Sequence, residues 1–276
     1  KPMISISGLG SSTALKLIDA TRDKQLDLMR DSAANKRAEE AFRDRIGDIS
    51  SPEELIADFE VYSFVMRAFD LEDQIFGKGL IRKMLESDPV EPSSLLNRLT
   101  DSRFREMHLA LGFTTEAGPQ TPDLTNPDFL NDVTTRFYNR QYINENDAQN
   151  ETVGTVLEFR DKFSGINKWF EVLASEKLTT FFQVALSLPE QMSALDLDKQ
   201  KALLADKFDL EKLADPAERE KLIARYVAIS DAVNPQGFQA NSIALDLLQS
   251  YNLGGQFVPI TIDVTAVTFS ASRLYR

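Results

Sequence analysis

Apolar residues recur along most of this chain at the three- and four-residue intervals of amphipathic helices. The first such segment is expected to run as one helix from residue 12 to residue 46, because it contains neither proline nor glycine. Charged residues separate its apolar positions, so the apolar stripe is narrow and more typical of a coiled-coil seam than of a core helix. We therefore expect this helix to project from the globular body or to pack on the helix predicted at 238–251. The stripe, which we take as a candidate interaction surface, includes Leu15, Ile18, Leu26 and Met29.

Shorter helices are expected to follow, separated by prolines and glycines. Residues 51–54, Ser-Pro-Glu-Glu, mark a helix start, because they place proline in the first turn and two acids at the positive end of the helix dipole. Residues 114–128 contain three prolines and are interpreted as a loop. The predicted helices cover residues 53–69, 71–86, 92–98, 101–112, 127–145, 147–162, 165–175, 175–187, 189–193, 197–207, 210–213, 216–230 and 238–251.

Patterns typical of β-strands occur at the two ends of the chain. Residues 4–7 alternate as Ile-Ser-Ile-Ser, and residues 257–269 are rich in Val, Ile and Thr. Alternation in the second segment holds for Ile260, Ile262 and Val264, which join the candidate interaction surface. Unpaired strands leave backbone polar groups unsatisfied, so we expect the two segments to pair with each other or with another chain.

Two parts of the chain resemble each other after a shift of 117 residues. Leu55–Ile75 then aligns with Val172–Met192, and five of the twenty-one positions are identical. Chance similarity between amphipathic helices is the alternative, but the alignment continues with small gaps and favours an ancient duplication. The duplication predicts that Phe64 and Phe181 are equivalent and buried. The helices expected to superpose are those at 53–69 and 71–86 on those at 170–187 and 195–207.

Together these patterns predict a mainly α fold. We expect an irregular multi-helix bundle with internal duplication, a long N-terminal helix and a small β element at the termini. The expected segments are an N-terminal strand and long helix at 1–50, a first helical repeat at 51–116, a second repeat at 117–235, and a C-terminal helix and β tail at 236–276. Aromatic residues at helical spacing are expected to form the core, namely Phe59, Phe64, Phe69, Phe181 and Phe182.

Composition excludes several classes of partner. The net charge is −12, and acidic residues interleave the basic ones, so the chain lacks the basic surface that nucleic-acid binding requires. There is no cysteine, hence no disulfide or thiolate metal site. No apolar stretch approaches the roughly 20 residues of a membrane span, and no cleaved signal is apparent. We therefore expect protein partners and no membrane span.

Candidate catalytic or ligand-binding motifs fail on spacing or on missing partners. His108 is the only histidine and is expected to be structural. Residues 8–13 (Gly-Leu-Gly-Ser-Ser-Thr) lack the third glycine of a dinucleotide fingerprint, and residues 76–79 (Phe-Gly-Lys-Gly) lack P-loop spacing. Residues 196–200 start like a calcium loop but lack its later glycine and glutamate. We predict no catalytic, cofactor-binding or metal-binding residues, and no enzyme activity.

An ordered series of short motifs carries a family resemblance. The series is Gln149-Asn150-Glu151, Trp169-Phe170-Glu171-Val172-Leu173-Ala174, Leu188-Pro189-Glu190, Ala194-Leu195-Asp196-Leu197-Asp198-Lys199-Gln200, Asp215-Pro216 and Arg225-Tyr226. It resembles an uncharacterised helical family from alphaproteobacteria, domain of unknown function 1217, over roughly residues 50–235. Members are often encoded in flagellar gene clusters, and some carry more than one copy of the domain.

The resemblance implies a non-enzymatic structural or assembly protein of the bacterial flagellum, acting by protein–protein interaction. Its partners would be flagellar components or further copies of itself. It would either be associated with the flagellum, after export without a cleaved signal, or be cytoplasmic. The alternative is a cytoplasmic adaptor or a chaperone-like binding module.

Overall fold

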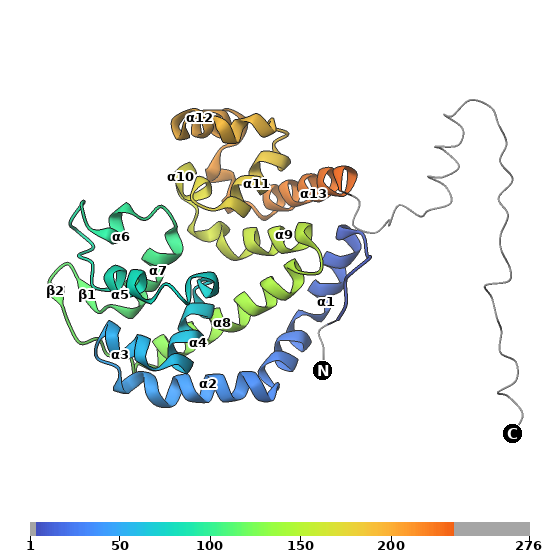
Figure 1. The fold of residues 1–276 in the computed structure, drawn as a ribbon. Helices are drawn as coiled ribbons and strands as arrows, with labels where there is room; N and C mark the ends of the chain where they lie inside the picture. Colours follow the sequence, from blue (N-terminus) through green and yellow to red (C-terminus); the bar gives the residue numbers. More distant parts are fainter. Residues whose placement is uncertain (1–3, 235–276) are drawn as a thin grey trace, which may run out of the picture. The chain divides into compact units, whose positions relative to one another are not determined.

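The computed structural model describes residues 4–234, which form a mainly α-helical fold (Figure 1). None of the helices within this range is both long and apolar enough to cross a bilayer. The helices are α1 (Ser11–Arg30), α2 (Ala33–Arg45), α3 (Pro52–Ala57), α4 (Phe59–Ala68), α5 (Lys78–Leu85), α6 (Leu95–Arg98), α7 (Ser102–Leu111), α8 (Pro127–Asp147), α9 (Glu151–Lys162), α10 (Trp169–Leu173), α11 (Glu176–Ala185), α12 (Leu197–Lys207) and α13 (Pro216–Val233). Short 3₁₀ turns are η1 (Ile46–Asp48), η2 (Glu72–Gln74), η3 (Phe163–Gly165), η4 (Glu190–Ala194) and η5 (Leu210–Ala214).

The N-terminal helix is divided in two, so the prediction of one continuous helix over residues 12–46 is wrong. Ser32 begins α2 as its N-cap, because its hydroxyl accepts a hydrogen bond from the backbone N–H of Asn35 at 3.2 Å. The Asn35 amide in turn donates to the carbonyl oxygen of Met29 at 2.9 Å and satisfies the end of α1. Local side-chain capping therefore stops the helix without proline or glycine.

The first helix also does not project from the body. α1 packs on α8, α9 and α13, all of which begin more than ninety residues after α1 ends. Its buried face is wider than its apolar stripe, because the polar side chains of Ser11 and Gln25 are buried as well. The alternative expectation, pairing with a helix at 238–251, lies outside the described residues.

Elements of the two predicted repeats recur at matching positions. η1 and η3 are 117 residues apart at both ends, and so are α4 and α11. α3 and α10 start 117 residues apart, α2 and α9 start 118 apart, and α5 and α12 start 119 apart. The matching elements are α2 to α5, which we call the first repeat from here on in place of residues 51–116. Their counterparts are α9 to α12, which we call the second repeat in place of residues 117–235.

The turn that ends α4 has the same conformation as the turn that ends α11. Asp70 and Ser187 both have left-handed backbone, with φ of 57° and 54°, and within residues 4–234 no other residue except glycine has positive φ. The next N–H reaches back to the helix in each case, from Leu71 to Met66 and from Leu188 to Gln183, both at 2.8 Å. These are Schellman motifs, which close a helix by satisfying its last carbonyls.

Aromatic stacking repeats in the core. Phe42 stacks on Phe64 with ring centroids 4.6 Å apart, and Phe159 stacks on Phe181 at 4.1 Å, each pair 117 residues from the other. The prediction that Phe64 and Phe181 are buried is confirmed. A following helix covers each pair: Phe137 of α8 stacks on Phe64, and Tyr226 of α13 packs on Phe181. Thus α13 covers the second repeat as α8 covers the first.

The β structure in residues 4–234 is a two-stranded antiparallel ribbon, β1 (Thr114–Thr115) and β2 (Gly118–Pro119), inside the predicted loop. The expected N-terminal strand is absent from residues 4–7. Ile6 is instead buried, and its N–H donates to the side-chain oxygen of Gln149 at 2.9 Å. The C-terminal partner expected for it lies outside the described residues.

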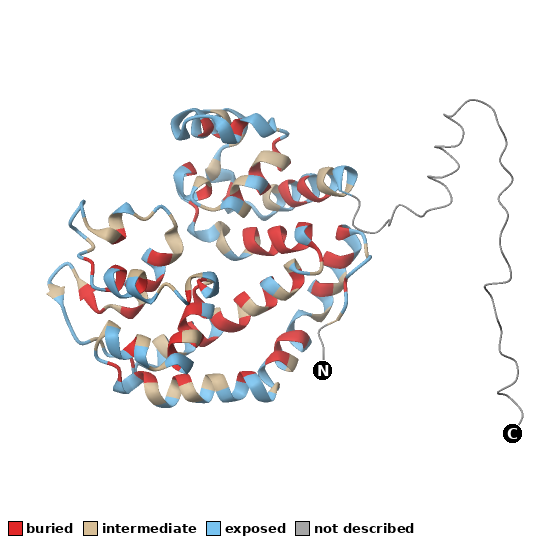
Figure 2. Cartoon of the chain, viewed as in Figure 1, coloured by how far each residue is buried: buried red, intermediate tan, exposed pale blue. Residues whose placement is uncertain are grey.

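A single hydrophobic core runs from Ile6 to Val227 (Figure 2). It crosses the predicted boundary near residue 117, because α8 packs on α4 of the first repeat and on α9 of the second. The predicted segments within residues 4–234 therefore share one core.

Candidate functional site

The structure buries the part of the predicted interaction surface that it describes. Leu15, Ile18, Leu26 and Met29 all lie in the core, on a helix that packs on α8, α9 and α13. They are closed to a partner in this fold, so their assignment to an interaction surface is corrected. The remaining three residues of that surface, Ile260, Ile262 and Val264, lie outside the described residues.

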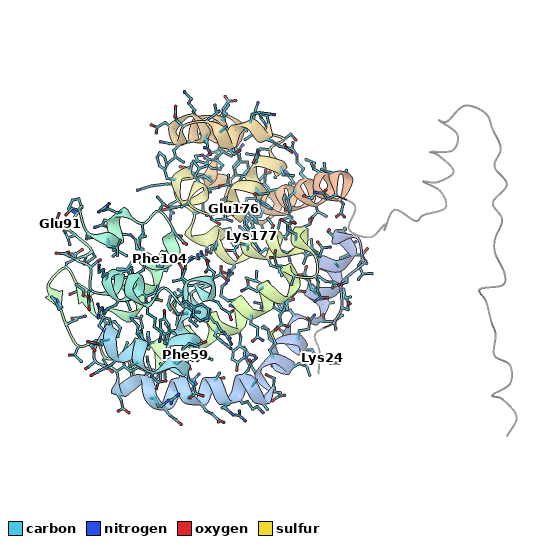
Figure 3. The ribbon with its side chains drawn as sticks, in the orientation of Figure 1. Lys24, Phe59, Glu91, Phe104, Glu176 and Lys177 are labelled. Atoms are coloured by element: carbon cyan, nitrogen blue, oxygen red, sulfur yellow. The ribbon has the colours of Figure 1, made fainter. Side chains whose placement is uncertain are left out.

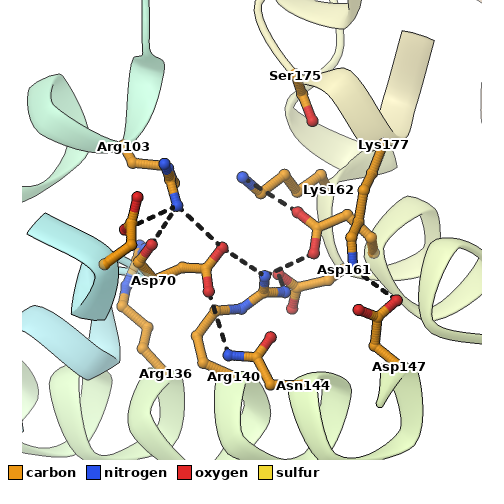
Figure 4. Close-up of polar contacts among 12 residues, drawn as sticks. Asp70, Arg103, Arg136, Arg140, Asn144, Asp147, Asp161, Lys162, Ser175 and Lys177 are labelled. Carbon is orange, nitrogen blue, oxygen red and sulfur yellow. Dashed lines mark hydrogen bonds and ion pairs between the residues drawn. The ribbon is translucent and has the colours of Figure 1, made fainter. Parts of the chain in front are cut away.

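A cleft of about 610 Å³ lies at the boundary between the repeats. α8 supplies residues along it, α7 and the end of α4 line one side, and α9 and η3 line the other (Figure 4). Most of its polar side chains are charged, and the two signs are present in equal number. A smaller neighbouring cleft shares Asp70, Arg103 and Lys162 with it.

Arg140 of α8 is the buried centre of this charged group. Its guanidinium lies 2.6 Å from a carboxylate oxygen of Glu158 and 2.7 Å from one of Asp161, with Asp70 at 3.8 Å. Burial opposes the charge on Arg140, but the carboxylates outweigh it and raise its pKa. Burial likewise would raise the pKa of Glu158, but Arg140 and Lys162 hold that pKa below its ordinary value. Arg140 and Glu158 therefore both stay ionised.

Arg103 joins α7 to the end of α4. Its guanidinium is 2.8 Å from Asp101, which also caps α7 by accepting from the backbone N–H of Arg103. It donates to the backbone carbonyl of Asp70 and lies 3.5 Å from the Asp70 carboxylate. Burial would raise the pKa of Asp101, but hydrogen bonds from Arg103 and its positive charge lower it. Asp70 also accepts from the side chain of Asn144, at 3.2 Å, so its turn is held from α7 and from α8.

Two lysines drawn in Figure 4 are also paired with carboxylates. Lys162 lies 3.3 Å from Glu158, and Lys177 lies 2.6 Å from Asp147. General acid catalysis at neutral pH needs a carboxyl group with a raised pKa. The cleft instead lowers the pKa of Glu158 and Asp101, so its geometry is that of an ionic junction between the repeats.

The comparisons with known proteins identify the family. Residues 68–218 match the family model described as "Protein of unknown function (DUF1217)". The chain belongs to this family. The resemblance inferred from the sequence motifs is thereby confirmed. The X-ray crystal structure of protein AGR_C_984 from Agrobacterium tumefaciens is similar, with a TM-score of 0.73 and 26% sequence identity, over 85% of this chain and 99% of that one. No curated protein matches the chain.

The DUF1217 match includes the whole ionic junction, from Asp70 at the end of α4 to Lys177 in α11. No pattern in the sequence indicated this junction, because its residues are spread over about a hundred positions of a chain with 43 acids. The left-handed backbone of Asp70 likewise cannot be predicted from the residue type.

His108 of this DUF1217 protein is buried on α7. One ring nitrogen, Nε2, lies 2.9 Å from the backbone carbonyl oxygen of Ser87, and the other has no partner within the described residues. Burial lowers the pKa of His108, so the neutral ring is favoured. The role found here is packing within the first half of the chain.

The three other motifs have structural roles. Gly8 and Leu9 lie in the turn before α1, and Gly10 is the N-cap of that helix. Asp231 of α13 lies at the start of α1 and accepts hydrogen bonds from the N–H and the hydroxyl of Ser11. Gly77 is the N-cap of α5, and Asp196 is the N-cap of α12. Within residues 4–234 no cluster of three or more acidic or histidine side chains is arranged to hold a metal ion.

Several large apolar side chains of this DUF1217 protein are exposed. Phe76 is 89% exposed, Leu109 at the edge of the cleft 62%, and Leu197 on α12 56%. Phe59, predicted as core, is 53% exposed at the start of α4 (Figure 3). The prediction is wrong for Phe59 because α4 buries the face that carries Val61, Tyr62 and Val65.

Proposed function

We propose that this protein is a non-enzymatic structural or assembly protein of the bacterial flagellum that acts through protein–protein interaction. The observation that carries the interaction role is the exposure of large apolar side chains, above all Phe76. A ring as exposed as that of Phe76 is open to a partner, and aromatic side chains are the usual anchors of protein–protein interfaces. The scaffold beneath them is packed as one core, and a repeated helical scaffold of this kind offers extended surfaces to partners.

The ionic junction supports the same role. Buried ion pairs contribute little net stability, but they can specify one packing arrangement over others. Arg140 of α8 pairs with Asp70, which follows α4 in the first repeat. The same guanidinium pairs with Glu158 and Asp161 of α9 in the second repeat. A fixed arrangement of the two repeats keeps the surfaces on both at a constant separation, as a component of an assembly requires.

The flagellar assignment rests on the family, whose members are often encoded among flagellar genes. Location is the decisive experiment. Hook–basal bodies purified from the native organism are examined for this protein by immunoblotting, with a strain lacking its gene as the control. We expect the protein in the purified structures, or a defect in them when the gene is absent. A protein confined to the soluble fraction, with normal flagella in the deletion strain, would refute the assignment and favour a cytoplasmic adaptor.

A further inference from the structure

One exposed face of the first repeat combines apolar and oppositely charged groups. We define the α3–α5 face by Glu53 of α3, Asp73 of η2, Phe76, and the basic residues Lys78 and Arg82 of α5. All five side chains are exposed. α3 packs directly on α5, so Glu53 lies on a helix next to the one that carries Lys78 and Arg82.

Phe76 is held outward by the structure around it. The preceding residue, Ile75, is buried, and its carbonyl oxygen accepts a hydrogen bond from the buried hydroxyl of Tyr62 at 3.1 Å. Gly77 then donates its N–H to the carbonyl oxygen of Gln74 at 2.8 Å, which closes the turn before α5. With both neighbours fixed, the ring of Phe76 stays 89% exposed.

Three of the four charges on this face have no ion-pair partner within residues 4–234, whereas the fourth, Asp73, lies 3.8 Å from Arg103. Within residues 4–234, Lys78 and Arg82 have no carboxylate within 4.0 Å, and Glu53 has no basic group within that distance. Lys78 and Arg82 are four residues apart and therefore lie on the same side of α5. The Lys78 ammonium also lies 5.8 Å from the centre of the Phe59 ring, which places a second exposed aromatic beside the basic group.

We infer that a second copy of this chain binds the α3–α5 face through the same face, about a twofold axis. In such an interface the acidic part of one copy meets the basic part of the other, and both contacts form twice. Phe76 would lie near the centre, where an aromatic anchor contributes most to binding. The inference builds on the proposed interaction role by naming the partner.

Charge argues for a second copy over an anionic surface. A membrane or nucleic acid would attract Lys78 and Arg82 but repel Glu53 and Asp73 on the same face, and the whole chain carries −12. A copy of the same face presents both signs and can pair with both. The self-complementary arrangement therefore fits a second copy best.

The test is sedimentation velocity of the purified full-length chain over a wide range of concentrations. We expect a reversible monomer–dimer equilibrium that weakens as salt is added. Phe76→Ser should raise the dissociation constant about tenfold or more. Leu197→Ser is the matched control, because it removes a similarly exposed apolar side chain from α12 and should leave the equilibrium unchanged.

Charge reversal distinguishes this face from general stickiness. The double variant Lys78→Glu/Arg82→Glu and the double variant Glu53→Lys/Asp73→Lys should each be monomeric, and an equimolar mixture of the two should form heterodimers. Thermal melts monitored by circular dichroism check that each variant is folded. A wild-type protein that stays monomeric, a dimer indifferent to Phe76→Ser, or a mixture that fails to associate would overturn the inference. These results concern purified protein alone, so they are independent of whether the protein is found in flagella.

Discussion

Ser187 holds left-handed backbone at the end of α11, and the substitution Ser187→Gly should stabilise the protein. Left-handed backbone costs a residue with a Cβ roughly 1–2 kcal/mol, whereas glycine adopts it freely. Glycine also has a more flexible unfolded state, which offsets roughly 0.5–1 kcal/mol of that gain. The Ser187 side chain is exposed, and within residues 4–234 its hydroxyl has one hydrogen bond, a long one of 3.5 Å from Arg225, so its loss costs little. The expected net gain is about 0.5–1 kcal/mol.

Asp70 provides the comparison, because its backbone has nearly the same φ. Asp70→Gly relieves the same strain but removes the carboxylate that accepts from Asn144 and faces Arg103 and Arg140. Removing it leaves the buried Arg140 with less opposing charge, which costs on the order of 1–3 kcal/mol. We therefore expect Asp70→Gly to be neutral or destabilising. Asp70→Asn, which keeps an oxygen acceptor and tolerates left-handed backbone, should lie between Asp70→Gly and the wild type.

Urea denaturation followed by circular dichroism at neutral pH measures all three variants against the wild type. Ser187→Gly should raise the urea midpoint with an unchanged slope, and the midpoint of Asp70→Gly should lie below that of Ser187→Gly. Equal effects of the two glycine substitutions would show that the Asp70 carboxylate contributes nothing. If Ser187→Gly instead destabilises the protein, the left-handed backbone at this turn does not lower the free energy of unfolding of the wild type.

Four further predictions follow from the packing. Arg140→Ala should destabilise the fold by about 3–5 kcal/mol in urea denaturation, because it removes the buried guanidinium that pairs with both Glu158 and Asp161. Phe181→Ala should cost about 3–5 kcal/mol in the same assay, since its ring stacks between others in the core. Gly154→Ala should cost about 1–3 kcal/mol by thermal melting, because a Cβ there would lie 2.6 Å from the backbone Cα of Asp147. Burial lowers the pKa of His108 in the folded state, so the unfolded chain binds a proton at this residue more readily. Stability is therefore lost as pH falls below 6.5 towards the folded-state pKa. His108→Gln should flatten that part of a stability–pH profile.

Periodicity predicted the helical class and the repeat, because both depend on local spacing of apolar residues. Phe64 and Phe181 were found from the sequence alone, since an aromatic residue at the same place in two similar helices fills the same space in both. The division at Ser32 was missed although the N-cap residue was visible. A serine among charged residues stops a helix only when its side chain turns back to the backbone, as it does toward Asn35.

Contacts between distant segments explain the remaining errors. α1 was expected to be partly exposed because its apolar stripe is narrow, but buried Ser11 and Gln25 widen the face that packs. The partners that allow Ser11 to be buried are Asn150 and Asp231, well over a hundred residues away, and no local pattern indicates them. The same holds for Arg140, whose pairing with Asp70 depends on how α8 lies against α4.

The pairing of Ser11 with Asp231 has a consequence for how the protein is made. The two residues are 220 positions apart, so the first turn of α1 lacks its cap until the ribosome has released nearly all of α13. α2 to α8 contain the contacts around Phe64 and can assemble earlier during synthesis. The N-terminal segment is made first and finishes folding last. During that interval the part of α1 that packs on α13 is uncovered and is open to any chaperone that meets the nascent chain.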